Sequence, residues 1–120
     1  MARASQSAPT PPEPTALETE AGIQITHIGV TASGGLVDAR FRVLDPAKAN
    51  TLLGNSANAP VLISGDLPPL MAPHHALKGG RYAKDQVLIV LYPNMRQAVR
   101  PGTSVSVAFG PVRVGPVVAQ

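Results

Sequence analysis

Hydrophobic and polar residues alternate most clearly in residues 37–43, where apolar side chains occupy the odd positions and charged side chains the even ones. This period of two predicts a strand with one buried face and one face in solvent. In residues 22–31 the alternation changes phase at His27, which predicts a β-bulge near that residue or a switch between sheets. The sequence Ala-Ser-Gly-Gly at 32–35 predicts a hairpin turn between these two strands.

A short helix is predicted directly after the second strand. Asp45 offers a side-chain acceptor at the N-cap, Pro46 suits the first helical position, and Gly54 ends the segment. We therefore expect about two helical turns between Pro46 and Gly54.

Five further segments have the composition of strands, namely 61–64, 67–71, 86–92, 104–109 and 112–118. The nearly continuous apolar run in 86–92 is typical of a central strand that is covered on both faces. Ten side chains are predicted to face the core: Val37, Ala39, Phe41, Val43, Val87, Ile89, Leu91, Val105, Val107 and Phe109. The pattern as a whole predicts an all-β fold, an immunoglobulin-like antiparallel β-sandwich of about seven strands with one short helix.

Composition divides the chain into two parts. The 120 residues include 13 Pro and 11 Gly, which disfavours long helices, and only 3% aromatic residues, so aliphatic side chains must form most of the core. Residues 1–20 are rich in Pro, Ser and Thr, and their only large aliphatic residue after Met1 is Leu17. This composition predicts a disordered leader at 1–20, followed by a single β-sandwich domain at 21–120.

The composition of the predicted leader indicates the cellular location of the protein. A flexible segment of this kind is typical of the stretch between a cleaved signal or lipid attachment point and a folded body, which favours a periplasmic or secreted protein. A cytosolic protein is the alternative, because residues 1–20 lack the apolar stretch of a signal peptide. No apolar run approaches the roughly 18 residues of a membrane-spanning helix, so no membrane span is expected.

Charge and side-chain inventory narrow the function classes. The net charge of +3 resides mainly on arginines of the domain, but aromatic side chains for base stacking are scarce, so nucleic acid is not expected as a partner. The absence of cysteine excludes disulfides, thiolate metal sites and cysteine nucleophiles. No Ser-His-Asp spacing, phosphate-binding loop or paired acidic site stands out, which predicts that the protein is not an enzyme.

Methionine and histidine residues in two loops form the most distinctive chemical pattern. Met71, His74 and His75 fall within five residues, and Met95 lies in the next loop. Thioether and imidazole groups are ligands that suit Cu(I), so these four residues are predicted to form a metal site with copper as the cofactor. Alternatively, the histidines are exposed loop residues and the methionines fill gaps at the edge of the core. His27 is expected to be a half-buried structural histidine at the bulge.

Three segments, Arg-Phe-Arg-Val-Leu-Asp-Pro-Ala-Lys-Ala at 40–49, Gly-Arg-Tyr at 80–82 and Val-Arg-Pro-Gly-Thr-Ser-Val-Ser-Val at 99–107, resemble a group of small exported bacterial β-sandwich domains of undefined activity. The resemblance covers about residues 22–119. It implies a single secreted or periplasmic β domain and assigns no catalytic residues.

We expect a small exported binding protein that binds or handles copper through its Met/His loop. The alternative is a non-catalytic interaction or structural module of a bacterial envelope assembly, in which the same loop contacts an envelope protein. Titration with copper ions separates the two functions.

Overall fold

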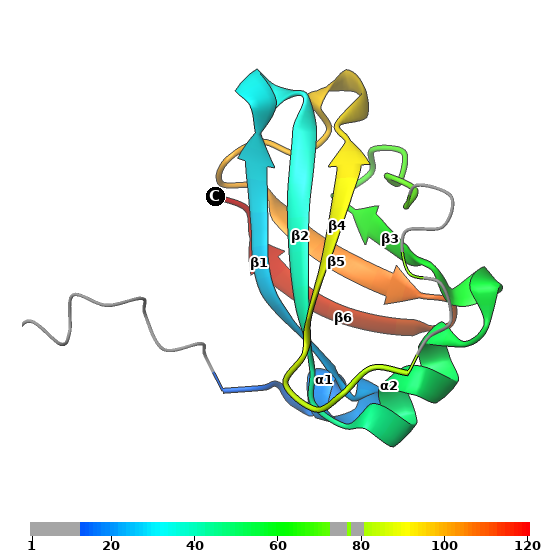
Figure 1. Cartoon of the computed structure of the whole chain (residues 1–120). Helices are drawn as coiled ribbons and strands as arrows, with labels where there is room; N and C mark the ends of the chain where they lie inside the picture. The colour runs from blue at the N-terminus through cyan, green and yellow to red at the C-terminus, as the bar shows by residue number, and fades with distance from the viewer. Residues whose placement is uncertain (1–12, 73–76, 78–80) are drawn as a thin grey trace, which may run out of the picture.

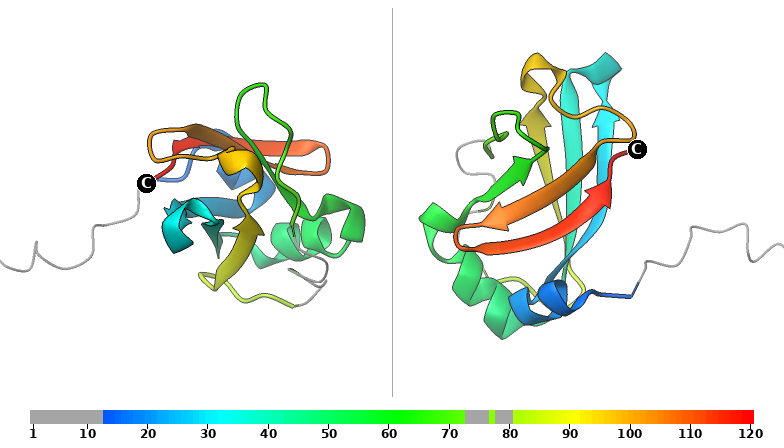
Figure 2. Two further views of the ribbon diagram at one scale, coloured as in Figure 1. Left: turned by 90° about the horizontal axis from the view of Figure 1, so that it is seen from above. Right: turned by 180° about the vertical axis from the view of Figure 1, so that it is seen from behind.

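The computed structural model describes residues 13–72, 77 and 81–120. These residues form two three-stranded antiparallel sheets and two α-helices (Figure 1). One sheet has the order β1-β2-β4, formed by β1 (Ile23–Thr31), β2 (Leu36–Val43) and β4 (Val87–Pro93). The other has the order β3-β5-β6, formed by β3 (Pro60–Ile63), β5 (Ser104–Phe109) and β6 (Val112–Val118). The helices α1 (Ala16–Ala21) and α2 (Pro46–Leu53) lie together at one end of the sheets (Figure 2).

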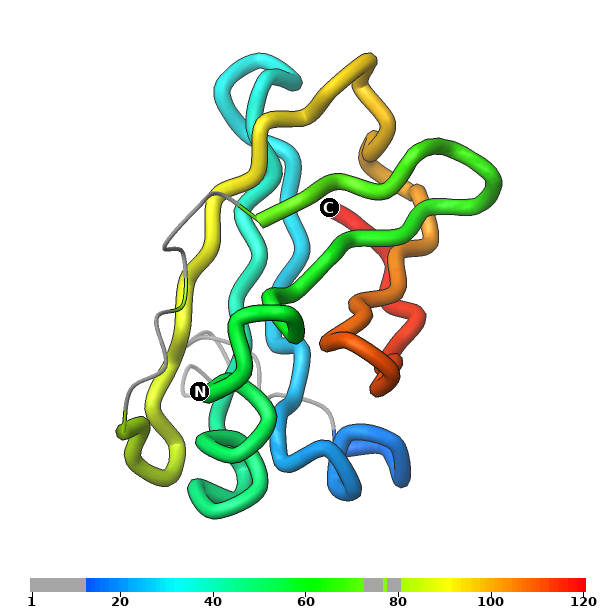
Figure 3. Tube along the Cα trace, turned by 90° about the vertical axis from the view of Figure 1, so that its right-hand side faces the viewer, coloured from blue at the N-terminus to red at the C-terminus, as the bar shows by residue number. Residues whose placement is uncertain are grey.

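This arrangement confirms a mostly β fold and is compatible with a β-sandwich, since the two sheets form separate layers when viewed from the side (Figure 3). The described residues contain six strands instead of about seven. The expected strand at 67–71 is reduced to one bridge between Leu70 and Leu62. Pro68 and Pro69 precede this bridge and carry no N–H group, so they cannot extend it into a ladder.

The pairing of β1 with β2 confirms the first hairpin, which turns through the 3-10 segment η2 (Ala32–Gly34). Its register shifts between Ile25 and His27, where the phase change predicted a bulge. His27 is half-buried, and its ring occupies the space that a side chain at Gly29 would need. The structural role expected for His27 therefore agrees with its position.

Helix α2 begins as the sequence predicts. The Asp45 carboxylate accepts hydrogen bonds from the backbone N–H groups of Ala47 at 3.0 Å and Lys48 at 3.3 Å, and Pro46 occupies the first turn. The side-chain acceptor and the fixed φ of proline together define this helix start.

Helix α1 was not predicted and corrects the boundary of the leader. Thr15 and Glu18 form a capping box, in which the Glu18 N–H donates to the Thr15 hydroxyl at 3.1 Å and the Thr15 N–H donates to the Glu18 carboxylate at 3.0 Å. The second carboxylate oxygen of Glu18 accepts from the N–H of Ile25 in β1 at 2.8 Å. Residues 16–20 therefore belong to the folded domain, whereas residues 1–12 of the predicted leader lie outside the described residues.

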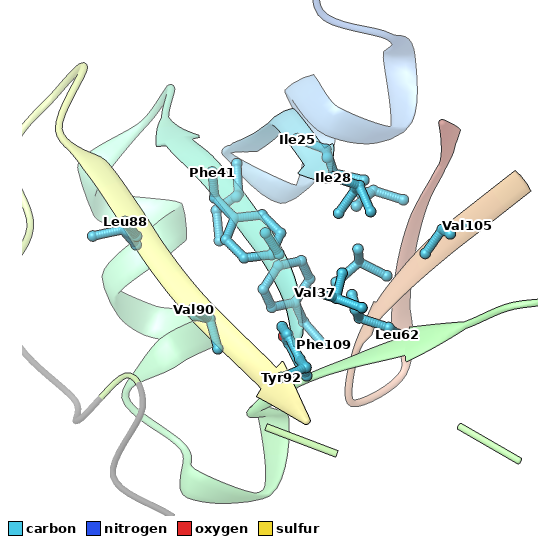
Figure 4. Close-up of a cluster of buried hydrophobic side chains, with 14 of the residues drawn as sticks. Ile25, Ile28, Val37, Phe41, Leu62, Leu88, Val90, Tyr92, Val105 and Phe109 are labelled. Carbon is cyan, nitrogen blue, oxygen red and sulfur yellow. The ribbon is translucent and has the colours of Figure 1, made fainter. Parts of the chain in front are cut away.

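Aromatic rings occupy the centre of the core, between the two sheets (Figure 4). The Phe41 and Phe109 rings pack edge to face, with centroids 5.7 Å apart and planes inclined at 71°. Tyr92 is fully buried beside them and donates its hydroxyl to the carbonyl of Pro60 at 3.0 Å. Burial raises the pKa of Tyr92 well above its usual value, because the phenolate would lose its hydration.

Seven of the ten predicted core residues are fully buried, but the phase predicted for β4 is wrong. Val87, Ile89 and Leu91 are 52%, 55% and 47% exposed, while the even-numbered side chains of the strand are buried in their place. The strand lies at the edge of its sheet and has one face in solvent, contrary to the expected central strand.

Candidate functional site

The structure places the two predicted methionine ligands on different segments. Met71 follows Leu70, which bridges to β3 of one sheet, whereas Met95 opens the 3-10 turn η4 (Met95–Gln97) after β4 of the other sheet. Both side chains are 66% exposed. The alternative in which they fill gaps at the edge of the core is therefore wrong. Their thioether sulfurs are accessible to a soft metal ion.

The predicted histidine ligands His74 and His75 lie outside the described residues. Within the part of the chain that the structure describes, no three His, Asp or Glu side chains are grouped as a metal site would require. His27 lies on β1, in the sheet opposite the Leu70 bridge that precedes Met71. The four-residue copper site remains a prediction.

The outer face of β4 presents the clearest candidate for binding. Val87, Ile89 and Leu91, called here the β4 stripe, point to solvent from three alternate positions of one strand. About half of each side chain is exposed, and no charged residue interrupts the strand. A row of exposed aliphatic side chains on an edge strand is unusual in a monomeric protein, since edges are normally protected by charge, proline or a covering segment.

Hydrogen bonds at both ends of β4 fix the direction of its backbone groups. The Val43 N–H donates to the Gln86 carbonyl at 3.0 Å, and the Asn94 N–H donates to the Gly35 carbonyl at 2.9 Å. The pairing of β2 with β4 keeps one register between these two points. Because both backbone groups of a residue in an antiparallel strand point to the same side, and that side alternates, the even-numbered residues of β4 bond to β2. The residues of the β4 stripe therefore direct their N–H and C=O groups to the other edge.

The remaining sheet edges are covered or interrupted by the chain itself. Along β1, the N–H of Val30 donates to the carbonyl of Gln120 at 2.8 Å, and the N–H of Gln120 donates to the carbonyl of Ile28 at 2.9 Å. Leu70 covers part of β3 by the same kind of paired bonding. Edge strand β6 contains Pro116, which has no N–H to offer. Within residues 13–72, 77 and 81–120, no backbone hydrogen bond reaches the outer edge of β4, and the strand has no internal interruption.

The charged row of β2 lies beside the β4 stripe on the outer face. The Arg40 guanidinium donates to both oxygens of Asp38, at 3.2 and 2.9 Å, and this hydrogen bonding raises the pKa of Arg40 above its usual value. Arg42 donates to the side-chain oxygen of Gln24 at 2.9 Å and lies 3.6 Å from Asp85. These carboxylates lie in ion pairs with arginines on an open face of the sheet.

None of the helices in residues 13–72 and 81–120 has the length and apolarity needed to cross a membrane. Comparisons of the chain with protein-family models, with curated proteins and with solved structures give no match. The β4 stripe is thus identified by its geometry alone. From the sequence, Val87, Ile89 and Leu91 were predicted to face the core. The apolar run contains no polar residue that would mark which face of the strand lies in solvent.

Proposed function

We propose that this protein is a non-catalytic interaction module that binds an extended protein segment along β4. The observation that carries the proposal is the β4 stripe, in which exposed aliphatic side chains and outward-directed backbone groups belong to the same three residues. Strand addition uses both features, because backbone hydrogen bonds supply affinity and alternate side chains supply selectivity. An immunoglobulin-like strand order and an exported location, both expected from the sequence, are part of this proposal.

Photo-cross-linking tests the proposal directly. A photoreactive amino acid is placed at position 89, in the centre of the β4 stripe, and in a matched protein at Val118, which is 62% exposed on β6. Illumination in an extract of the producing cells is expected to give a defined adduct from position 89 and none from position 118. Excess unlabelled protein should change the yield of the adduct, lowering it for a partner of another sequence and raising it for a second copy of this chain, whereas the variant Ile89→Lys should not change it. Equal labelling from both positions would contradict the proposal, as would the absence of an adduct from position 89 in a protein that also stays monomeric.

Copper binding is the second candidate function, favoured by the exposure of the Met71 and Met95 side chains. Thioethers are soft ligands, and two imidazoles from the residues that follow Met71 in the sequence would complete a coordination suited to Cu(I). We propose His74 and His75 as those imidazole ligands on the basis of the sequence. This function is independent of the β4 stripe, so the two proposals can be tested separately.

A further inference from the structure

We infer that the partner of the β4 stripe is β4 of a second copy of this chain, paired antiparallel about a two-fold axis at Ile89. The inference rests on the proposed function and names its partner. It follows from the register that β4 offers to itself, from its lack of charge, and from the positions of the charged side chains beside it.

The direction of the backbone groups limits the registers that such a pair can adopt. Since Val87, Ile89 and Leu91 direct their N–H and C=O groups to the free edge, they form the hydrogen-bonded pairs of an antiparallel ladder. The register that places Ile89 opposite Ile89 of the second copy, and Val87 opposite Leu91, is the one that pairs all three residues of the β4 stripe with one another, and we therefore infer it. The ladder ends at Pro93, which has no N–H to donate.

The same register brings the exposed aliphatic side chains together. Directly opposite residues of an antiparallel pair place their side chains on the same face of the sheet. The β4 stripes of the two copies therefore form one continuous apolar patch on the outer face. Each stripe gains the other as a lateral neighbour, so the sides of the half-exposed side chains that face the strand edge become buried while the outer face stays open.

Electrostatics permits this pairing despite the positive charge of the protein, which is +3 in total. The residues of β4 carry no charge, because the strand's only ionisable side chain, Tyr92, is buried and its pKa is raised. The charged row on β2 is separated from its counterpart by three strand spacings, roughly 14 Å at about 4.8 Å each. That separation exceeds the Debye length of about 8 Å at physiological ionic strength. Like charges are therefore screened across the two-fold axis.

The proposed interface is one strand pair with at most the 7 residues of β4 on each side, against roughly 20–30 residues a side in a standard stable interface. We therefore expect a weak dimer that forms as the protein concentration rises. For a weak contact, the dissociation constant should lie between about 10 µM and about 1 mM. Sedimentation velocity on the purified full chain should therefore show a single species of 12.4 kDa at about 10 µM and a shift toward twice that mass at about 1 mM.

Two variants test the position of the contact. Ile89→Lys places like charges directly opposite each other at the two-fold axis, so the dimer dissociation constant should rise at least about tenfold. Val118→Lys adds the same charge to a similarly exposed aliphatic position of the other sheet. This variant should leave the dimer dissociation constant unchanged. An equal loss of dimer in both variants would overturn the inference, because a general charge effect and not β4 pairing would then control association.

Amide hydrogen exchange on the wild-type protein gives a second measure that needs no variant. The N–H groups of Val87, Ile89 and Leu91 should gain protection as concentration rises, whereas those of Leu88 and Val90, which already bond to β2, should not change. Protection that is independent of concentration would overturn the inference. A monomer at all concentrations that still forms a specific adduct from position 89 in extract would reject the second copy and retain the interaction module. The absence of both dimer and adduct would reject both.

Discussion

Replacing Glu18 by alanine tests whether α1 is part of the folded domain. The Glu18 side chain is 5% exposed, and its two carboxylate oxygens accept hydrogen bonds from the N–H groups of Thr15 and Ile25, at 3.0 and 2.8 Å. Loss of the carboxylate leaves the buried N–H of Ile25 without its acceptor, at a cost of about 1–3 kcal/mol. It also removes one half of the capping box, which contributes about 0.5–1 kcal/mol. We expect the free energy of unfolding to fall by about 1.5–4 kcal/mol, a large part of the roughly 5–15 kcal/mol that typical domains possess.

Urea unfolding followed by circular dichroism measures this difference, with the unfolding slope expected to stay constant. Glu20→Ala is the matched control, since Glu20 is an exposed glutamate of the same helix. Its effect should lie within about 0.5 kcal/mol. If the two variants lose the same stability, the contact between Glu18 and Ile25 does not hold α1 to the sheet, and the placement of residues 16–20 in the domain is refuted.

Three further results are expected. Phe109→Ala should cost about 3–5 kcal/mol in urea unfolding, and a loss under about 1 kcal/mol would contradict its place in the core. Because burial raises the folded-state pKa of Tyr92, its contribution to stability is complete below about pH 10 and is lost as the pH rises further, so Tyr92→Phe should weaken the alkaline loss of stability seen by urea unfolding. Calorimetry should show that Cu(I) binds with higher affinity than Zn(II) and that this affinity falls below about pH 6. Binding should persist in His27→Ala and be lost when His74 and His75 are both replaced by alanine. A wild-type affinity no tighter than about millimolar would reject the copper site.

The elements that the sequence predicted correctly are those in which polar residues mark a boundary or a face. Charged side chains at alternate positions of residues 37–43 fixed the inward phase of β2, and serines did the same in β5. Asp45 and Pro46 defined the start of α2. Helix α1 was missed because the Pro- and Thr-rich composition before it hid a local signal. That signal is the spacing of Thr15 and Glu18, which is the pattern of a capping box.

The candidate site was less accessible to sequence reasoning, for two different physical reasons. The copper prediction depends on bringing together side chains of two loops, and loop conformation is set by contacts that spacing does not encode. The β4 stripe depends on which strand lies at a sheet edge, which is a property of the tertiary fold. The local pattern of residues 86–92 predicts neither the free edge nor the exposed face.

The apolar run of β4 nevertheless has a consequence that holds for either phase. If the odd-numbered residues faced the core, Leu88 and Val90 would lie in solvent instead, and the ring of Tyr92 would leave the contact with Pro60 that buries it. An edge strand of this composition exposes aliphatic side chains whichever face is buried. The sequence predicted a strand covered on both faces, and a single copy of the chain covers only one. The proposed pairing with a second copy would supply the missing hydrogen-bonded neighbour at the strand edge, but it would leave the outer face of the sheet open, so the expected coverage of both faces is wrong for the pair as well as for the single chain.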